Sequence, residues 1–369
     1  MTPLDRRPAL RWLVPAAVAV ALVGGGSAIG AISAAARGGL PHRTAAQLLV
    51  DVQNARLDGL SGTIAQSSDL GLPALPGMGS GSSDMTSLVS GSHTLRLWYA
   101  GPEHVRLALL GTLGESDLVR NGTDLWTWTS ADRSATHRKL AAGDGSHAPA
   151  KVPAVGAMTP QQAADAALKA ITPSTKVTTD GTAVVAGRSA YELVLQPRDA
   201  RSLVDSVRIA VDGKTHVPLR VQVLAKGGGD PAFEVGFTAF DPTSPSLSVF
   251  RFNPPPGTKV THGTTAIPGS RAPRDHAAPS GTGKDTGSGT ASPKVVGTGW
   301  TTVVVTKAPT SALPGSLGTL LPKLPKTSGA WGSGHVLQGT LFSAVLTDDG
   351  RVAVGAVAPQ MLYDALGRG

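Results

Sequence analysis

Apolar and polar positions alternate with a repeat of two along much of the chain. Two neighbouring segments, 93–100 and 103–110, show this repeat clearly, and the Gly-Pro pair between them is typical of a turn. A repeat of two is that of a strand with one covered face, so the segments predict an antiparallel pair of strands. The apolar residues that share a face are Leu95, Leu97 and Tyr99 in the first segment, and Val105, Leu107 and Leu109 in the second.

The sequence VRNGTDLWTWTS, residues 119–130, predicts a hairpin. Asn121 and Gly122 form its turn because both residue types tolerate a positive φ, and this interpretation outweighs a glycosylation sequon at the same place. Trp126 and Trp128 lie two positions apart beyond the turn and therefore share a face of the strand. We expect that face to be the buried one.

Helical signals are few. Thr44 can cap a helix that ends by Gly59, with Gln47 completing a capping box, and Thr159 can cap a second helix up to Ile171. The other segments of the region predict one antiparallel sheet of about ten strands with two or three helices, and a sheet of that size must curl. The later predicted strands lie within residues 176–197, 203–225, 231–241 and 247–257.

Residues 67–92 are rich in Gly, Ser and Pro, with a few leucines and Met78 scattered through them. This composition favours a flexible surface insertion. A mobile apolar flap over a cleft is the alternative that the leucines leave open.

The first 40 residues have the pattern of a segment that directs a chain to a membrane. Basic residues extend to Arg11, no charge occurs from Trp12 to Ala36, and Arg37 follows. The uncharged stretch is long enough to span a bilayer, while its glycines and small residues are typical of a signal-peptide cleavage region, so the segment is either a retained anchor or a cleaved signal peptide. In both cases the positive-inside rule sends everything after Ala36 outward. The protein is therefore expected to be exported, as a membrane-anchored or secreted protein at the extracytoplasmic face.

Composition and charge exclude several kinds of site and partner. The absence of cysteine excludes disulfides, thiolate metal sites and a lipidated amino-terminal cysteine. The net charge of +8 comes partly from the arginines before the first apolar segment and from the loose region around Arg271, without a basic stripe interleaved with aromatic residues. No nucleic-acid partner is expected.

The order of these segments resembles the LolA and RseB family of lipoprotein-carrier-like extracytoplasmic domains over most of residues 41–260. The family's strand that ends in tryptophan after a glycine turn is similar to the stretch from Asn121 to Trp126. Two further motifs match in order and spacing, and the matching residues are Val211, Asp212, Thr215, Pro218 and Val223, then Phe250, Phe252, Pro254, Pro255 and Gly257.

The resemblance implies a LolA-like half-barrel, a large curled antiparallel sheet with covering helices, whose concave apolar face receives acyl chains of a lipid or lipoprotein. The strand and helix patterns after Trp300 predict a small C-terminal α+β lobe, so the expected fold class is α+β. No cofactor is expected. A curled sheet with few helices cannot easily fill its own concavity, which agrees with the expectation of an acyl-binding face. The candidate cavity-lining residues, for which core packing alone is the alternative, are Leu97, Trp98, Tyr99, Leu107, Leu109, Trp126 and Trp128.

We expect four parts: the signal peptide or anchor at 1–40, the lipid-binding domain at 41–260, a disordered linker at 261–295 and a small C-terminal domain at 296–369. Two lobes joined by a linker are similar to RseB more than to LolA. The alternatives to a carrier are therefore an RseB-like envelope sensor that regulates a membrane partner, such as an anti-sigma factor, and a non-enzymatic structural envelope protein.

Enzyme signatures are absent from the sequence. There is no GxSxG or HExxH motif, the histidines are scattered, and the stretch GTGKDT departs from a phosphate loop at Asp285. The chain is expected to bind without catalysing a reaction, and no metal site is expected.

Overall fold

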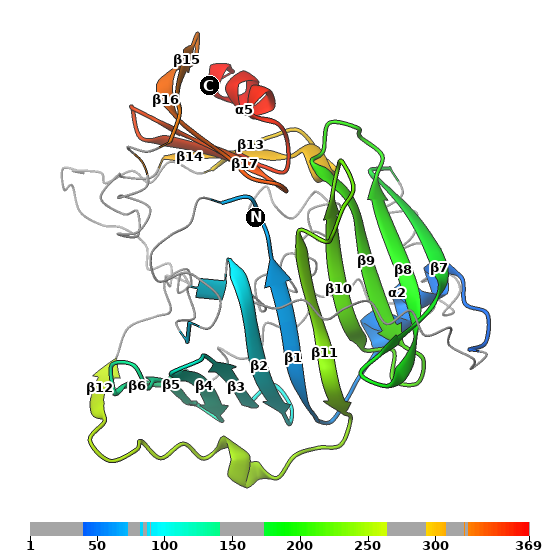
Figure 1. Cartoon of the computed structure of the whole chain (residues 1–369), viewed down its shortest axis with the longest axis vertical. Coiled ribbons are helices and arrows are strands. Elements are labelled where there is room, and N and C mark those ends of the chain that lie inside the picture. Colours follow the sequence, from blue (N-terminus) through cyan, green and yellow to red (C-terminus); the bar gives the residue numbers. More distant parts are fainter. Residues whose placement is uncertain are drawn as a thin grey trace, which may run out of the picture.

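The computed structural model describes residues 40–72, 82–83, 87–88, 90–140, 173–263, 293–307, 321 and 324–368. Within these residues, twelve strands form one large open sheet in the order β12-β6-β5-β4-β3-β2-β1-β11-β10-β9-β8-β7 (Figure 1). The strands are β1 (Leu60–Ser68), β2 (Gly91–Tyr99), β3 (His104–Leu110), β4 (Glu115–Asn121), β5 (Asp124–Thr129), β6 (Ser134–Lys139), β7 (Thr175–Val185), β8 (Arg188–Pro197), β9 (Val204–Asp212), β10 (Pro218–Ala225), β11 (Phe233–Asp241) and β12 (Lys259–Gly263).

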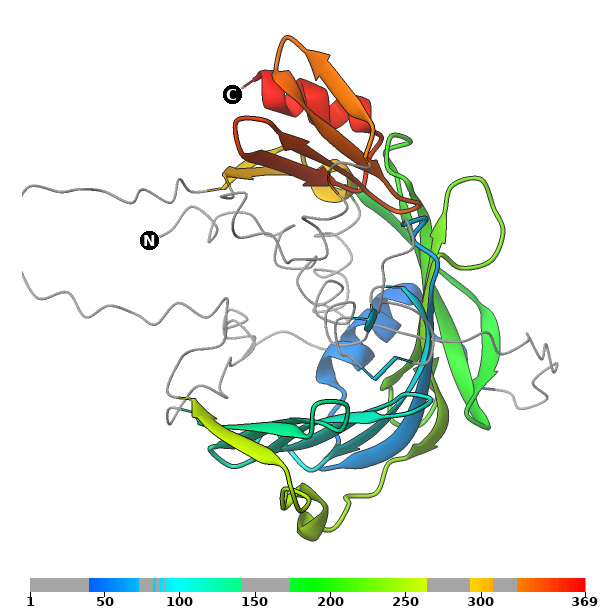
Figure 2. The ribbon, with the colours of Figure 1, turned by 60° about the vertical axis from the view of Figure 1, so that its left-hand side comes forward.

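The large sheet curls without closing, as the sequence predicted (Figure 2). Hairpins join β2 to β6 in sequence and β7 to β11 in sequence, and β1 joins the two series by pairing with both β2 and β11. The hairpin predicted over residues 119–130 is confirmed, but its turn residues are Gly122, with φ of 63°, and Thr123, because Asn121 pairs with Asp124 as the last residue of β4. One departure is β12, which pairs with β6 in parallel, whereas only antiparallel pairs were expected.

The segment predicted as a strand over 247–257 is instead a short 3-10 helix, η3 (Leu247–Phe250), followed by extended chain. Prolines on both sides explain the error: Pro245 precedes the helix, and the run of prolines from Pro254 cannot donate to a strand ladder. Phe250 is fully buried, so the alternation of apolar residues here reflects side chains that anchor a connector.

Helix α2 (Ala45–Asn54) begins at the predicted capping box. The Thr44 hydroxyl accepts from the Gln47 amide at 3.2 Å, and the Gln47 side chain accepts from the Thr44 amide at 3.0 Å. The helix lies inside the curve of the large sheet (Figure 2), where Leu48 packs against Tyr191 and Leu193. The sheet therefore has a concave face, on the side of α2, and a convex face.

A second, smaller sheet has the order β13-β14-β18-β17-β16-β15 within the described residues, and helix α5 (Pro359–Gly367) covers one of its faces. This lobe confirms the predicted small C-terminal α+β unit. Its other elements are β13 (Lys294–Val296), η4 (Gly299–Thr301), β14 (Val303–Lys307), β15 (Lys326–Gly329), β16 (Gly332–Gln338), β17 (Ser343–Thr347) and β18 (Arg351–Gly355).

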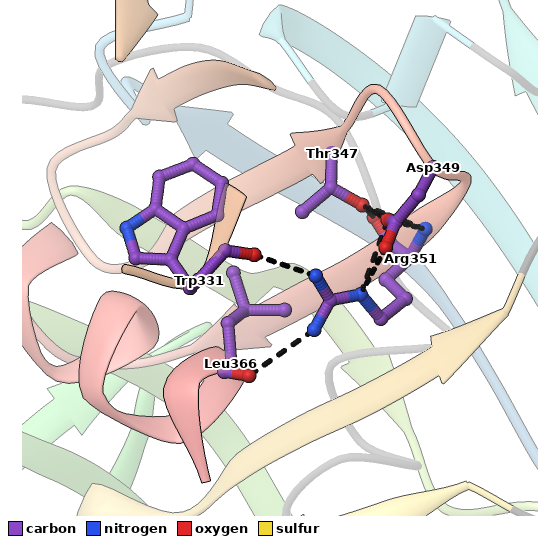
Figure 3. Close-up of polar contacts among 5 residues, drawn as sticks. All are labelled: Trp331, Thr347, Asp349, Arg351 and Leu366. Atoms are coloured by element: carbon purple, nitrogen blue, oxygen red, sulfur yellow. Dashed lines mark hydrogen bonds and ion pairs between the residues drawn. The ribbon is translucent and has the colours of Figure 1, made fainter. Parts of the chain in front are cut away.

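Arg351 fastens α5 to the second sheet (Figure 3). Its guanidinium group donates to the carbonyl oxygen of Trp331 at 2.7 Å and to that of Leu366, at the end of α5, at 3.1 Å. The same group pairs with the Asp349 carboxylate at 2.8 Å, and Asp349 accepts from the Thr347 hydroxyl. One side chain thus ties together the helix end, the turn before β16 and the hairpin between β17 and β18.

The two sheets contact each other directly. The Leu203 amide donates to the Ala356 carbonyl at 2.8 Å, and Ser202 forms an isolated bridge with Val357. The Trp300 indole donates to the Thr175 hydroxyl at 2.8 Å. The second lobe is therefore joined to the large sheet by backbone and side-chain bonds.

Several predicted segments lie outside the described residues: positions 1–39 of the signal or anchor, the helix predicted up to Ile171, and positions 264–292 of the linker. Both ends of the predicted linker are strand, since β12 ends at Gly263 and β13 begins at Lys294. Among the described residues, no helix is long and apolar enough to cross a membrane.

Candidate functional site: the concave apolar face

Strand register decides which predicted site residues share a face of the large sheet. Side chains of directly paired residues point to the same side, and successive residues point to opposite sides. Leu97 pairs with Leu107, and Leu95 pairs with Leu109. Trp98 pairs with Arg106, and Arg106 pairs in turn with Val119, the partner of Trp126. The leucines and the tryptophans therefore lie on opposite faces.

The leucines belong to the concave face. Their cluster crosses seven neighbouring strands, from β3 through β2, β1, β11, β10 and β9 to β8. Leu95 and Leu109 are fully buried, whereas Leu97 and Leu107 are only partly buried. The other apolar members of this concave cluster on the large sheet are Ile64, Leu195, Val204, Val207, Ile209, Val221, Val223, Phe233, Val235 and Phe237.

The tryptophans belong to the convex face, where the connector after β11 covers them. The Phe252 ring lies 5.3 Å from that of Trp126 and 6.4 Å from that of Trp128, measured between ring centroids. Figure 2 shows the connector with η3 on the outside of the curve, away from α2. Both tryptophans are half-buried, whereas Thr127 on the opposite face is exposed. The tryptophan face is thus covered, but by the connector on the convex side of the sheet.

The seven candidate residues thus do not line one surface. Leu97, Leu107 and Leu109 lie on the concave face together with Tyr99, which pairs with Val105. Trp98, Trp126 and Trp128 lie on the other face. The cause is the alternation itself, because Trp98 stands between Leu97 and Tyr99 and must point to the opposite side.

Charged groups on the convex face pair with one another. The Arg106 guanidinium bonds the buried Asp117 carboxylate at 2.5 Å and lies 5.6 Å from the centre of the Trp98 ring. It also reaches the Val249 carbonyl of η3 at 3.5 Å. Burial raises the pKa of the nearby Glu115 carboxyl above its ordinary value, and the neighbouring Asp117 charge adds to the rise. These contacts hold the connector against the sheet.

The concave face also contains buried polar side chains, and the sequence analysis missed Gln66 among them. Gln66 on β1 is 1% exposed and pairs with His93 on one side and Val235 on the other. Within the described part of the chain, neither its Nε2 nor its Oε1 atom has a hydrogen-bond partner. His93, by contrast, places its ring nitrogens 3.2 and 3.3 Å from the carbonyls of Ser82 and Ser90. The sequence could have indicated this position, because Gln66 lies two residues after Ile64 in the same strand and therefore shares its face.

The chemistry of the concave face is that of apolar contact. Among the residues that the structure describes, no group of three or more His, Cys, Asp or Glu side chains is placed to hold a metal ion. The large apolar side chains reach across both halves of the sheet, so this face offers a long surface to an apolar chain.

Comparison with known structures gives several distant likenesses. A structure of the Pseudomonas aeruginosa MucA/MucB complex matches at 15% identity and a TM-score of 0.40, over 87% of this chain and 96% of the other. A LolA superfamily protein from Nitrosomonas europaea matches at 12% identity and 0.21, over 57% and 99%. A putative outer membrane lipoprotein-sorting domain from Vibrio parahaemolyticus matches at 10% identity and 0.21, over 54% and 91%.

The likenesses have TM-scores of 0.40 or less and identities of 10% to 15%, so they say nothing of ligand or partner. The curled open antiparallel sheet with a small second lobe is the architecture that the resemblance to the LolA and RseB family led us to expect. No protein-family model matches the sequence, and no curated protein matches it.

Proposed function

We propose that the chain is an extracytoplasmic binding module that holds an acyl chain, from a lipid or a lipoprotein, against the concave face of its large sheet. Binding involves no chemical step. The expected export of everything after Ala36 would place the module at the outer side of the cell membrane.

One observation supports this function most directly: the concave cluster is continuous across seven strands, and several of its members are only partly buried. Leu97, Leu107 and Phe237 retain exposed surface that a bound chain would cover. Each methylene group that leaves water contributes about 0.8 kcal/mol, and this gain must exceed the cost of ordering the chain, so the affinity is expected to rise with chain length.

Native mass spectrometry of the full chain purified from its own membrane tests the proposal. A co-purifying lipid mass, recovered again after organic extraction, is the expected result. Binding of the apolar fluorophore diphenylhexatriene to delipidated protein gives an independent titration. A protein that never carries lipid and never binds this fluorophore would refute the proposed function.

A matched pair of variants locates the binding to the concave face. Leu97→Trp places a large ring on that face, and Arg96→Trp places the same ring on the convex face, one residue away, at an exposed position. We expect Leu97→Trp to weaken diphenylhexatriene binding by about tenfold, because the ring occupies surface that the ligand needs. Arg96→Trp should leave the affinity unchanged, and equal effects of both variants would contradict the assignment of the face.

A sensor that signals to a membrane regulatory protein is the second candidate. The observation in its favour is that Trp300, Leu341 and Ala356 of the second lobe pack against the concave cluster. A ligand on that cluster would therefore act on side chains of the second lobe. Crosslinking of the full chain in its own membrane, with and without added lipid, tests it: a lipid-dependent crosslink to one membrane protein supports the sensor, and a lipid-independent pattern contradicts it.

A further inference from the structure

The second sheet has an apolar face that α5 does not cover. Register aligns Val295 with Val304, Val304 with Val354, and Val354 with Ala344, and the row ends at Leu337. The three valines are 38%, 39% and 39% exposed. We name this row of five residues, one from each of five neighbouring strands, the valine face.

The opposite face of the same sheet is a complete core. Val303, Val345 and Ala353 are buried there against Leu362 and Leu366 of α5, and Trp331 closes the cluster. Because α5 is fixed on that side by Arg351, the helix does not also cover the valine face. Apolar side chains in the middle of a sheet that has one finished core are therefore left in contact with solvent.

The strand that carries Val354 leads directly to the concave cluster of the large sheet. Ala356 follows Val354 by two residues and packs against that cluster, whereas Val357, one residue later, packs into the core under α5. Leu341 and Trp300 of the second lobe also contact the concave cluster. Figures 1 and 2 both show β13, β14 and β17 between α5 and the large sheet, with β15 and β16 beside the helix. The side away from α5 is thus turned toward the large sheet.

We propose that the valine face is the second wall of the acyl-binding site, so that a long chain contacts the concave cluster first and the valine face with its distal carbons. This inference rests on the proposed function. It assigns the ligand class as an amphiphile with a chain too long for the concave cluster alone, and it assigns Val304 and Val354 as residues that set the preferred chain length. The backbone bond between Leu203 and Ala356 holds the two walls at one junction.

Chain length provides the test. Octanoic and hexadecanoic acids are titrated against diphenylhexatriene bound to the full chain, in the wild type and in the double variant Val304→Thr, Val354→Thr. Threonine keeps the shape and the strand preference of valine but adds a hydroxyl, which is costly to cover with a hydrocarbon. We expect the double variant to bind hexadecanoic acid about tenfold more weakly and octanoic acid with unchanged affinity.

The matched control is Val184→Thr, because Val184 is a strand valine of the large sheet with a similar exposure of 42%. It should leave both affinities unchanged. A gain-of-function variant, Val304→Phe, adds apolar area to the valine face and should strengthen hexadecanoic acid binding without affecting octanoic acid.

The outcomes separate the two proposals. If the wild type binds neither acid, the proposed function fails. If the wild type binds both acids and the double variant weakens neither, or weakens both by the same factor, the second wall is refuted while the function of the concave face stands. In either case, the valine face would be left as a surface for a protein partner.

Discussion

The indole ring of Trp126 stacks on the imidazole ring of His137, with centroids 4.3 Å apart and an angle of 15° between their planes. The His137 Nε2 atom bonds the Asp124 carboxylate at 2.6 Å, and this bond is the main cause that holds the pKa of Asp124 below its ordinary value. All three residues lie on the convex face, beside Phe252. The tryptophan therefore has a packing role that explains its presence without a ligand.

Trp126→Ala should accordingly destabilise the protein without weakening ligand binding. Loss of the stacked ring from a half-buried site is expected to lower the free energy of unfolding by about 2 kcal/mol, less than a fully buried tryptophan would cost. Chemical denaturation gives the stability, and diphenylhexatriene titration gives the affinity. Trp126→Phe should restore most of the stability. A loss of affinity with unchanged stability would return Trp126 to the binding site.

The local features of the fold could be predicted from the sequence. The Thr44 capping box and the hairpin that turns at Gly122 each depend on residues within a few positions of one another. The family-like spacing of Asp212 and Thr215 also has a local cause, because the carboxylate accepts from the Thr215 amide at 2.7 Å and from its hydroxyl at 2.8 Å.

The binding face could not be chosen in the same way. Alternation shows which side chains of a strand share a face, but it does not show which of the two faces lies inside the curve of the sheet. Large aromatic rings were therefore chosen as cavity-lining candidates. The choice between the two faces depends on contacts between distant segments, such as β1 with β11 and Phe252 with Trp126. The parallel pairing of β12 with β6 is equally non-local.

Gln66 provides a second prediction. A buried carboxamide without hydrogen bonds costs free energy that an apolar side chain of similar size does not. Gln66→Leu is therefore expected to raise the free energy of unfolding by about 1–2 kcal/mol. The measurement is urea denaturation of the full chain, free of ligand.

The matched control is Gln222→Leu on the convex face. The Gln222 amide donates to the Glu234 carboxylate at 2.9 Å, so this substitution removes a bond and should lower stability. The two glutamines should thus respond with opposite signs. A destabilised Gln66→Leu variant would mean that the amide is satisfied in solution.

Asp212 provides a prediction of pH dependence. Burial alone would raise its pKa, but the bidentate pair with Arg188, at 2.7 Å for both bonds, and the Thr215 donors outweigh burial and lower the pKa from 3.8 to about 2. Because the folded-state pKa lies below the ordinary value, the stabilisation is complete above about pH 4 and is lost as the pH falls toward 2. The lost contribution is about 2 kcal/mol.

Unfolding measured between pH 2 and 7 tests this in the wild type and in Asp212→Asn. The variant should be less stable at neutral pH, and the difference between the two proteins should shrink as the pH falls below about 4. Other carboxylates titrate in both proteins, so only the difference reports on Asp212. A difference that does not change with pH would show that the Arg188 pair contributes no net stabilisation.

Arg351 provides the last prediction, which concerns the second wall of the proposed site. Its guanidinium donates to the carbonyls of Trp331 and Leu366, so Arg351→Met leaves both without this charged donor (Figure 3). Hydrogen bonds to charged groups contribute about 1.5–3 kcal/mol, and the loss should appear first as faster amide exchange in α5 and in β16. Arg351→Lys should not restore the slow exchange, because an ammonium group lacks the planar fork that reaches both carbonyls.

Arg201→Met removes an exposed arginine paired with Asp199 and is the control, with an expected change close to zero. If α5 exchanged no faster in Arg351→Met than in this control, the helix would be held by its apolar face alone, and the valine face would depend only on the core beneath it.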